Sequence, residues 1–367
     1  MASFFAMGGR PMRMLSNAMM IMMVKHYRPK ANMIDSLYAT AGFQCSNLRD
    51  HVYALLSLPL TSSGLEPNYS LPVTDVYKEL ANRVLAVDQN LKMLALAPHN
   101  AMPPFSGPLE RLDLPSWIPD LSVQGSINHL VSYTIRDQLF NAGGSNASPI
   151  TITNDGRSLN LKGRIVDKIM LMATCFNDIP IPSEEDIAPK QGFPSRIKMW
   201  IRNWLLESRK LASKGDWDNW SPEQKRDFAI TMMCGMTGMR DALPEEVIAN
   251  FDIYMEYLIG FFTPDFKLTE EVREAMLTYG CLIEHPLLSM SAGRRFCVTH
   301  DGRMGMVRRE AVAGDLFCVI LGAEVPYVVR PTGKGSYELI GDCFLHGVMD
   351  GETLTDDRYE TVDIVLE

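Results

Sequence analysis

Apolar side chains recur every three to four residues over much of the chain, a spacing that is typical of one helix face. Residues 34–58 have this pattern, with a break where Ser46 or Asn47 can cap a second helix. A longer helix is predicted over residues 74–97, with Thr74 as its N-cap. Its apolar face would consist of Val76, Leu80, Val84 and Val87.

Helical spacing returns between residues 195 and 290. One helix of this stretch is predicted to begin at Ser221 and Pro222, because proline fits the first turn of a helix. The last helix is predicted to begin at Thr269, a capping residue that is followed by acidic residues, which suit the first turn. The helix that is predicted to begin near residue 195 would bury one apolar face, made of Trp200, Trp204, Leu205 and Leu211.

Strand patterns occur in two places, and Asp-Gly pairs mark the hairpin turns between them. Residues 150–172 read as two strands joined at 155–156. Residues 293–352 read as four or five short strands that begin with a hairpin at 301–302. So many short strands over about sixty residues are typical of a small barrel or a curled sheet.

These patterns predict an α+β protein with a mainly helical body, a short β-hairpin region and a small antiparallel β-sheet or barrel at the C-terminus. Prolines are frequent in residues 97–120, which predicts an extended segment anchored by the ring of Trp117. The predicted organisation is a Met-rich basic segment at 1–44, a helical and β-hairpin region at 45–176, a linker at 177–196, a helical region at 197–290 and an antiparallel β module at 291–367.

Composition narrows the possible functions. The chain has 367 residues, 46% of them hydrophobic and 22% charged, which is ordinary for a globular protein. Its net charge of −9 argues against nucleic acid as a partner, because nucleic-acid-binding proteins are usually basic. The seven cysteines are widely spaced, which favours reduced, buried thiols in the cytoplasm over a disulfide framework.

The first 34 residues contain no Asp or Glu and are rich in methionine. A basic, acid-poor start resembles a mitochondrial targeting sequence, and the alternative is a Met-rich helix that packs on the body of the protein. The apolar run at 14–24 is much shorter than the ~20 residues that cross a bilayer, so no membrane span is predicted. We therefore expect a cytoplasmic protein, with mitochondrial targeting as the less favoured alternative.

Common catalytic motifs are missing from the sequence: there is no P-loop, H-E-x-x-H, G-x-S-x-G or dinucleotide-binding glycine motif. The stretch "GDCFLHGVMDGE" at 341–352 instead places Cys343 and His346 near Asp342 and Asp350. Metal binding there would need further ligands, and a Cys–His nucleophile pair would need both side chains on one face. Residues three apart on a strand point to opposite faces, so we expect neither site.

Charged residues at two further places have a structural interpretation. Asp50 can complement a helix dipole while Arg49 forks onto a carboxylate or carbonyl. Five arginines flank the hairpin at 301–302 and could form a basic patch, although exposed charge on an outer hairpin face is the commoner arrangement. These are Arg294, Arg295, Arg303, Arg308 and Arg309.

Three ordered stretches resemble the fungal heterokaryon-incompatibility family: "CSNLRDHVYALLSL" at 45–58, "LPSWIPDLS" at 114–122, and the tail from 314 to 352. The family typically has Arg-Asp-Lys-Val-Tyr-Ala-Leu-Leu-Gly-Leu in the first stretch, so His51 and Ser57 depart from it. Its N-terminal domain, which resembles TIR domains and is associated with cell death, has no counterpart in residues 1–44. The resemblance implies the C-terminal half of such a protein, without that domain.

The family resemblance also implies a function. We expect a non-catalytic fungal protein of self/non-self recognition and programmed cell death that acts through protein partners and needs no cofactor, metal or catalytic residue. The alternative is an enzyme or metal-binding protein with a site around Asp342, Cys343 and His346. The motif residues to which the resemblance gives functional weight are Arg49, Asp50, Tyr53, Trp117, Asp315, Arg330, Asp342, His346 and Asp350.

Overall fold

The computed structural model describes residues 32–40, 43–57, 64–97, 112–122, 130–131, 138–145, 149–153, 156–179, 192–237, 241–263 and 265–367. They form two compact units that interleave along the chain. Unit 1 consists of the described residues of Met1–Asp167, together with Asp315–Cys343 and Gly347–Glu367. Unit 2 consists of the described residues of Lys168–Gly314, together with Phe344–His346. The predicted domain boundaries stay predictions. Residues 180–191 of the predicted linker, and 1–31 and 41–42 of the basic start, lie outside the described residues.

Unit 1 begins with short helices. They are α3 (Met33–Thr40), α4 (Asp50–Tyr53) with a 3-10 turn at Ala54–Ser57, and α5 (Val73–Asn82). A π-helical turn at Arg83–Val87 extends α5, and a 3-10 helix follows at Leu91–Ala95. Thr74 is not the cap of α5: Pro72 occupies that position and provides no side-chain hydrogen bond. The predicted apolar face is buried except for Val87, which is 57% exposed because the regular helix ends before it.

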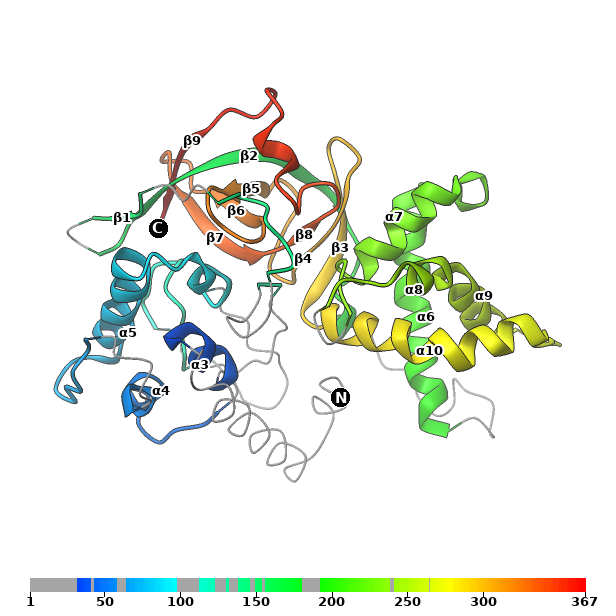
Figure 1. The fold of residues 1–367 in the computed structure, drawn as a ribbon, viewed down its shortest axis with the longest axis horizontal. Coiled ribbons are helices and arrows are strands. Elements are labelled where there is room, and N and C mark those ends of the chain that lie inside the picture. Colours follow the sequence, from blue (N-terminus) through cyan, green and yellow to red (C-terminus); the bar gives the residue numbers. More distant parts are fainter. Residues whose placement is uncertain are drawn as a thin grey trace. The chain divides into compact units, whose positions relative to one another are not determined.

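The strands of unit 1 form a closed ring (Figure 1). The neighbour order is β5-β6-β7-β9-β2, and a further pairing between β5 and β2 closes it. The ring is mixed, since β7 and β9 pair in parallel, so the prediction of a purely antiparallel module was wrong. The strands are β1 (Thr151–Ile152), which pairs with β2, then β2 (Leu159–Met172), β5 (Leu316–Ile320), β6 (Tyr327–Pro331), β7 (Tyr337–Asp342) and β9 (Val362–Leu366).

Close packing in this ring depends on a glycine. A Cβ at Gly163 of β2 would lie 2.9 Å from the carbonyl oxygen of Val319 and 3.2 Å from the sulfur of Cys318. Only glycine allows β2 to approach β5 at this distance. Burial raises the pKa of the Cys318 thiol to about 12, so it remains protonated and acts as an apolar core residue. None of the seven cysteines, all of which the structure describes, forms a disulfide, as predicted, and five of them are buried.

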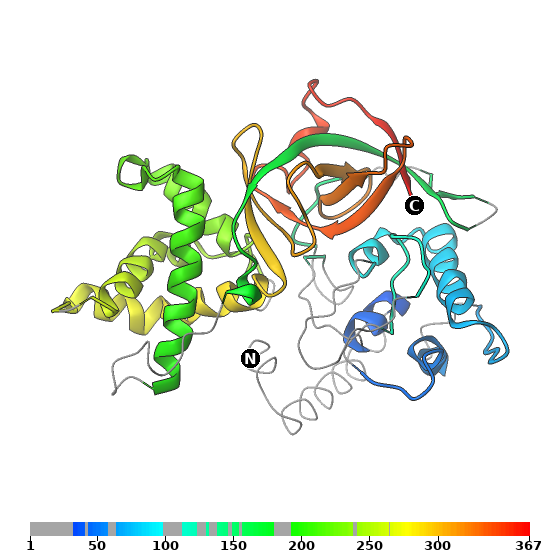
Figure 2. The ribbon, with the colours of Figure 1, turned by 180° about the vertical axis from the view of Figure 1, so that it is seen from behind.

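Unit 2 contains the longer helices, and Figure 2 shows α6 running past α9 and α10. Ser221 and Gln224 form a capping box at the start of α7, and Thr269 accepts a hydrogen bond from the Val272 amide at the start of α10. Both predicted caps are confirmed. The helices are α6 (Gly192–Ser213), α7 (Pro222–Met232), α8 (Glu245–Ala249), α9 (Phe251–Phe261) and α10 (Glu270–Met290).

The end of β2 pairs in unit 2 with β3 (Arg294–Thr299), which pairs with β4 (Met304–Arg308), and β4 pairs with β8 (Phe344–Leu345). The predicted hairpin turn is confirmed: Gly302 has φ +85° and donates to the Thr299 carbonyl. The expectation that the hairpin arginines lie on an exposed face was wrong for Arg294 and Arg308, which are opposite each other in the register and fully buried.

The structure is broadly α+β, as predicted, and a mainly helical body is not confirmed. None of the helices in the described ranges is long and apolar enough to cross a membrane.

Candidate functional site

The motif residues Arg49 and Asp50 begin α4 and have separate partners. The Arg49 Nε donates to the carbonyl oxygen of Leu71 at 2.7 Å, and its Nη1 donates to the Asn47 side chain at 3.3 Å. Asp50 accepts a hydrogen bond from the Tyr69 hydroxyl at 2.7 Å. Arg49 therefore ties the start of the helix to the following loop through one nitrogen on a backbone carbonyl, while its second nitrogen bonds to Asn47.

Three tyrosines extend this contact between α4 and the loop at 64–72. The buried Tyr53 donates to the Asn68 carbonyl at 3.0 Å, and its ring meets that of Tyr69 edge to face with centroids 5.2 Å apart. Tyr77 of α5 donates to the Leu48 carbonyl at 2.9 Å. Tyr69 itself remains 54% exposed although its hydroxyl is held by Asp50. The result is an aromatic side chain that is both exposed and fixed in place.

His51 connects the first two family motifs electrostatically. Burial lowers the pKa of His51, and the carboxylates of Asp120 and Asp50 oppose this shift. Asp120, from the second motif, is buried and accepts hydrogen bonds from the Leu112 amide and from Ser122. Burial, reinforced by Asp50, raises the pKa of the Cys45 thiol. A neutral imidazole beside a protonated thiol is a poor arrangement for a thiolate nucleophile.

Trp117 is fully buried, and its indole N–H donates to the Arg157 carbonyl at 3.0 Å. The adjacent Ser116 donates to the carbonyl of the C-terminal Glu367 and accepts from the amide of Leu339 in β7. The predicted anchoring by Trp117 is confirmed. The second motif thus attaches residues 114–122 to the ring of strands in unit 1, while residues 98–111 of the predicted extended segment lie outside the described residues.

Asp315 and Arg330 form a two-pronged ion pair between the start of β5 and the end of β6. Nε and Nη2 of Arg330 lie 2.8 and 3.0 Å from the two carboxylate oxygens. Glu338 of β7 lies 3.6 Å from the same guanidinium. The Asp315 side chain is 2% exposed and that of Arg330 is 34% exposed, so the pair closes the edge of the sheet and leaves one guanidinium face accessible.

Asp342 is fully buried at the end of β7, where its carboxylate accepts from the Leu130 amide at 2.8 Å. The next residue, Cys343, is also buried, and its amide donates to the Pro326 carbonyl at 3.0 Å. These contacts fix the chain as it leaves β7. Neither residue is accessible for chemistry with a dissolved substrate.

His346 belongs to unit 2 and has a different set of neighbours. Its Nε2 lies 3.1 Å from a carboxylate oxygen of Asp227 in α7, and its amide donates to the Met304 carbonyl. Its Nδ1 is buried and has no hydrogen-bond partner within the described structure. This residue links the β4–β8 pair to α7, a connection with no signal in the sequence because Asp227 lies more than a hundred residues earlier.

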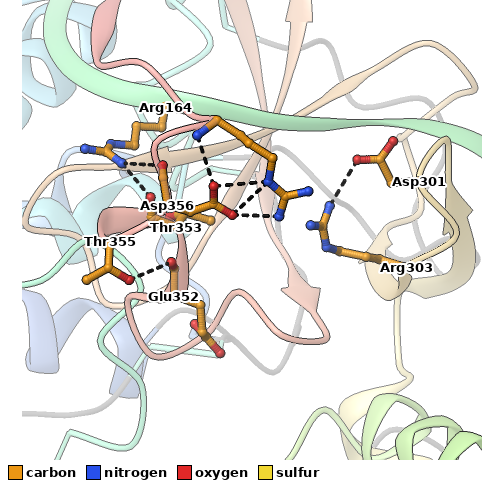
Figure 3. A network of polar contacts seen from close by, with 8 residues as sticks. Arg164, Asp301, Arg303, Glu352, Thr353, Thr355 and Asp356 are labelled. Atoms are coloured by element: carbon orange, nitrogen blue, oxygen red, sulfur yellow. Dashed lines mark hydrogen bonds and ion pairs between the residues drawn. The ribbon is translucent and has the colours of Figure 1, made fainter.

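Asp350 lies in an exposed turn of unit 1, where its amide donates to the Glu352 carboxylate at 2.7 Å. Burial and the neighbouring Glu352 raise the pKa of Asp350. Figure 3 shows the adjoining contacts: Arg164 of β2 donates to the carbonyls of Thr353 and Asp356, which holds the segment before β9 against β2. Figure 3 also shows the exposed ion pair of Asp301 with Arg303 in the β3–β4 turn of unit 2.

The motif residues do not form one constellation. Those of the first two motifs contact loops of unit 1, Asp315 and Arg330 contact each other, and His346 lies in unit 2. Within the described residues, no group of three ligand side chains gathers around Cys343 and His346.

Comparisons with known proteins agree with the motif pattern. A family model described as the Het-6 beta-barrel domain matches residues 271–365, from the first turn of α10 to β9. A curated protein, heterokaryon incompatibility protein 6, OR allele, from Neurospora crassa, is 24% identical over 343 residues. The chain is thus similar to a protein of heterokaryon incompatibility, and its residues 271–365 match the barrel domain named after such a protein. The alignment covers 84% of this chain and 49% of that relative, so the chain spans about half of the relative's length. No solved structure matches.

The closed ring of strands in unit 1 agrees with the barrel description of the family model. Sequence reasoning missed several residues that support the motif residues. Asp120 could have been found, because it lies inside the quoted second motif. Tyr69, Arg164 and Asp227 could not, because their roles depend on partners far away in the sequence.

Proposed function

We propose that the chain is a non-catalytic protein of heterokaryon incompatibility that acts by protein–protein interaction in self/non-self recognition and the regulation of cell death. The observation that carries this proposal is how the motif residues use their polar atoms. Arg49 and Asp342 bond to backbone groups, and Asp315 bonds to Arg330. Side chains used in this way stabilise a surface rather than transform a substrate.

The contact surface is proposed to include Tyr69 and the start of α4. Tyr69 is exposed, while its hydroxyl bonds to Asp50 and its ring packs on Tyr53. A rigid aromatic side chain loses little conformational entropy on binding, and tyrosines often dominate the binding energy of interfaces. Arg49 lies beside it and can add charge-assisted contacts at the rim.

The alternative function, an enzyme or metal-binding protein with a site around Asp342, Cys343 and His346, is not favoured by a specific observation. Asp342 and Cys343 are fully buried, whereas His346 pairs with Asp227. The proposed compartment is the cytoplasm. A fluorescent fusion of residues 1–40 tests this, because its accumulation in mitochondria would contradict the cytoplasmic assignment.

Expression in a fungal host tests the proposed function. We expect the chain alone to leave colony growth and viability unchanged, because a non-catalytic regulator needs a partner. Co-expression with a heterokaryon-incompatibility protein of the other compatibility type should change the fraction of dead cells after hyphal fusion. Strong cell death caused by the chain alone would contradict the proposal.

The proposed surface is tested by comparing Tyr69→Ala with Tyr359→Ala, a substitution of another tyrosine of unit 1. We expect Tyr69→Ala to weaken binding to the interacting protein by about tenfold or more, the effect of losing an interface anchor. Tyr359→Ala should leave the affinity unchanged. Equal affinity of the parent and both variants, measured by titration with the purified partner, would place the interface elsewhere.

A further inference from the structure

The solvent-facing side of α10 in unit 2 carries apolar side chains. Leu277 is 81% exposed, the largest fraction among the large hydrophobic residues that the structure describes, and Leu282 is 52% exposed. Cys281, which is also exposed, lies between them on the helix surface. The opposite side of α10, with the buried Ile283 and Leu287, packs toward α8 and α9 (Figure 1). Neighbouring exposed apolar residues on one side of a helix indicate an interaction surface.

The exposed side of α10 is symmetric about its middle. It consists of three pairs of residues, and the two members of each pair are equally far from the midpoint between residues 279 and 280: Leu277 with Leu282, Thr278 with Cys281, and Glu274 with His285. All are exposed except His285, which is partly exposed. Such a pattern is self-complementary, because a twofold axis brings each residue of one copy to its pair member in the other copy.

The charges of this surface favour an antiparallel pair of α10 helices. The central line of the surface is formed by side chains separated by four, three and four residues, a spacing that keeps them on one side of a helix: Glu274, Thr278, Cys281 and His285. In an antiparallel pair, Glu274 of one copy lies opposite His285 of the other at both ends of the contact, and the imidazole can donate a hydrogen bond to the carboxylate. A parallel pair would instead bring the two Glu274 carboxylates together, and like charges repel.

We propose that the chain forms a homodimer in which two copies of α10 pack antiparallel through this surface. A second copy fits because its charges complement those of the first and because Leu277 and Leu282 of both copies cover the flanks of the same contact. A single helix pair is small for a specific interface, so the dimer should be weak and depend on protein concentration. The surface lies in unit 2, whereas the surface around Tyr69 lies in unit 1, so this inference does not depend on the proposed function.

Sedimentation equilibrium of the full chain tests the proposal. In a dilution series up to about 100 μM, a dimer with a Kd of about 10 μM would be mostly formed at the highest concentration. Leu277→Glu should weaken the dimer by about tenfold or more, because it places a charge on an apolar contact. Leu171→Glu is the matched control, since Leu171 is 45% exposed and lies in unit 2 on β2, away from α10, and it should leave the association unchanged. A chain that stays monomeric over the whole series would overturn the proposal.

An exchange of charges tests the antiparallel register. His285→Glu should weaken dimerisation by about tenfold or more, since it places two carboxylates opposite each other at both ends of the contact. Adding Glu274→Lys to this variant should restore the parental association, because each end then again has opposite charges. Circular dichroism of both variants checks that α10 remains helical. A dimer that the first substitution weakens and the second does not restore would contradict the proposed pairing.

Cross-linking locates the contact directly. The pairing places the two Cys281 residues three positions apart along the helices, about 4.5 Å at the rise of an α-helix. A short bismaleimide, which joins two exposed thiols, should therefore link the parent into a covalent dimer, and Cys281→Ser should abolish this product. A dimer that appears in sedimentation but is not cross-linked through Cys281 would place the interface elsewhere and overturn the proposal.

Discussion

The strand ring of unit 1 and the helices of unit 2 are held together over very different distances along the chain. In unit 1, Ser116 bonds to Glu367, which is 251 residues away, and Leu130 bonds to Asp342, which is 212 residues away. In unit 2, the starts of α7 and α10 are fixed by hydrogen bonds that span three residues. The comparison shows that the ring of unit 1 depends on contacts between distant segments. In unit 2, by contrast, hydrogen bonds between neighbouring residues fix the starts of α7 and α10.

This difference has consequences for folding. Local contacts form with a small loss of chain entropy, whereas contacts between distant segments must first close long loops. We expect the helices of unit 2 to form early, and the ring of unit 1 to form only after β2, β5 to β7 and β9 have been brought together. The following predictions test this contrast, from the largest expected effect to the smallest.

Trp117→Ala should have the largest effect, because it removes a fully buried ring from unit 1. We expect a loss of about 3–5 kcal/mol in the free energy of unfolding. Hydrogen exchange followed by mass spectrometry should show faster exchange at residues 315–343 as well as near the substitution, since both belong to unit 1. Trp220→Ala, which alters a partly exposed ring of unit 2, should spare the strands of unit 1. Equal protection loss in both units would contradict the contrast.

Asp315→Asn should have an intermediate effect, because it removes the carboxylate that binds two nitrogens of Arg330. We expect a cost of about 1–3 kcal/mol, the range for hydrogen bonds to charged groups when a buried partner is lost. Urea unfolding of Asp315→Asn, Arg330→Met and the double variant measures the coupling. If the losses of unfolding free energy in Asp315→Asn and Arg330→Met simply add in the double variant, the ion pair contributes no coupling energy between β5 and β6.

Ser221→Ala should cost about 1 kcal/mol through the lost cap of α7. Because the cap acts on a single helix turn, faster hydrogen exchange should be confined to the first residues of α7. Ser221→Asp keeps a capping oxygen and serves as the control, with little expected loss. A change that extended to the strands of unit 1 would show that α7 is not stabilised locally.

His51 should give the smallest effect. Burial lowers its pKa in the folded state, so the neutral imidazole is favoured there. Its contribution to stability is present above the unfolded pKa and is lost as pH falls through the folded pKa. Below about pH 6.5 the parent should therefore lose stability relative to His51→Asn. Parallel pH profiles of the two proteins would show that the pKa of His51 is the same in the folded and unfolded states.

Much of the fold could be predicted because its signals are local. Ser221 and Thr269 cap helices as expected, Gly302 forms the turn between β3 and β4, and Trp117 is buried between prolines. The family motifs could also be recognised in sequence. The end of the long helix predicted at residues 74–97 could not, because the regular helix stops at Asn82 and a π-helical turn at Arg83–Val87 leaves Val87 exposed.

The candidate site was predicted only in part. The motif residues were found, but not their partners, since Arg49 bonds to a loop carbonyl and His346 bonds to a helix of unit 2. Strand β9 was missed although its buried Ile364 and Leu366 alternate with more exposed residues. Five residues of alternation are a weak signal, and β9 pairs with both β2 and β7 only because the chain returns to unit 1 at its end.

The sequence by itself determined where α7 and α10 begin, where the hairpin of β3 and β4 turns and to which family the chain is related, because caps, turns and motifs act over a few residues. The tertiary structure decided that the strands close into a ring with one parallel pair, that Arg294 and Arg308 are buried, and that His346 pairs with Asp227. Those outcomes depend on desolvation and on contacts between segments far apart in the chain. No pattern of neighbouring residues contains that information.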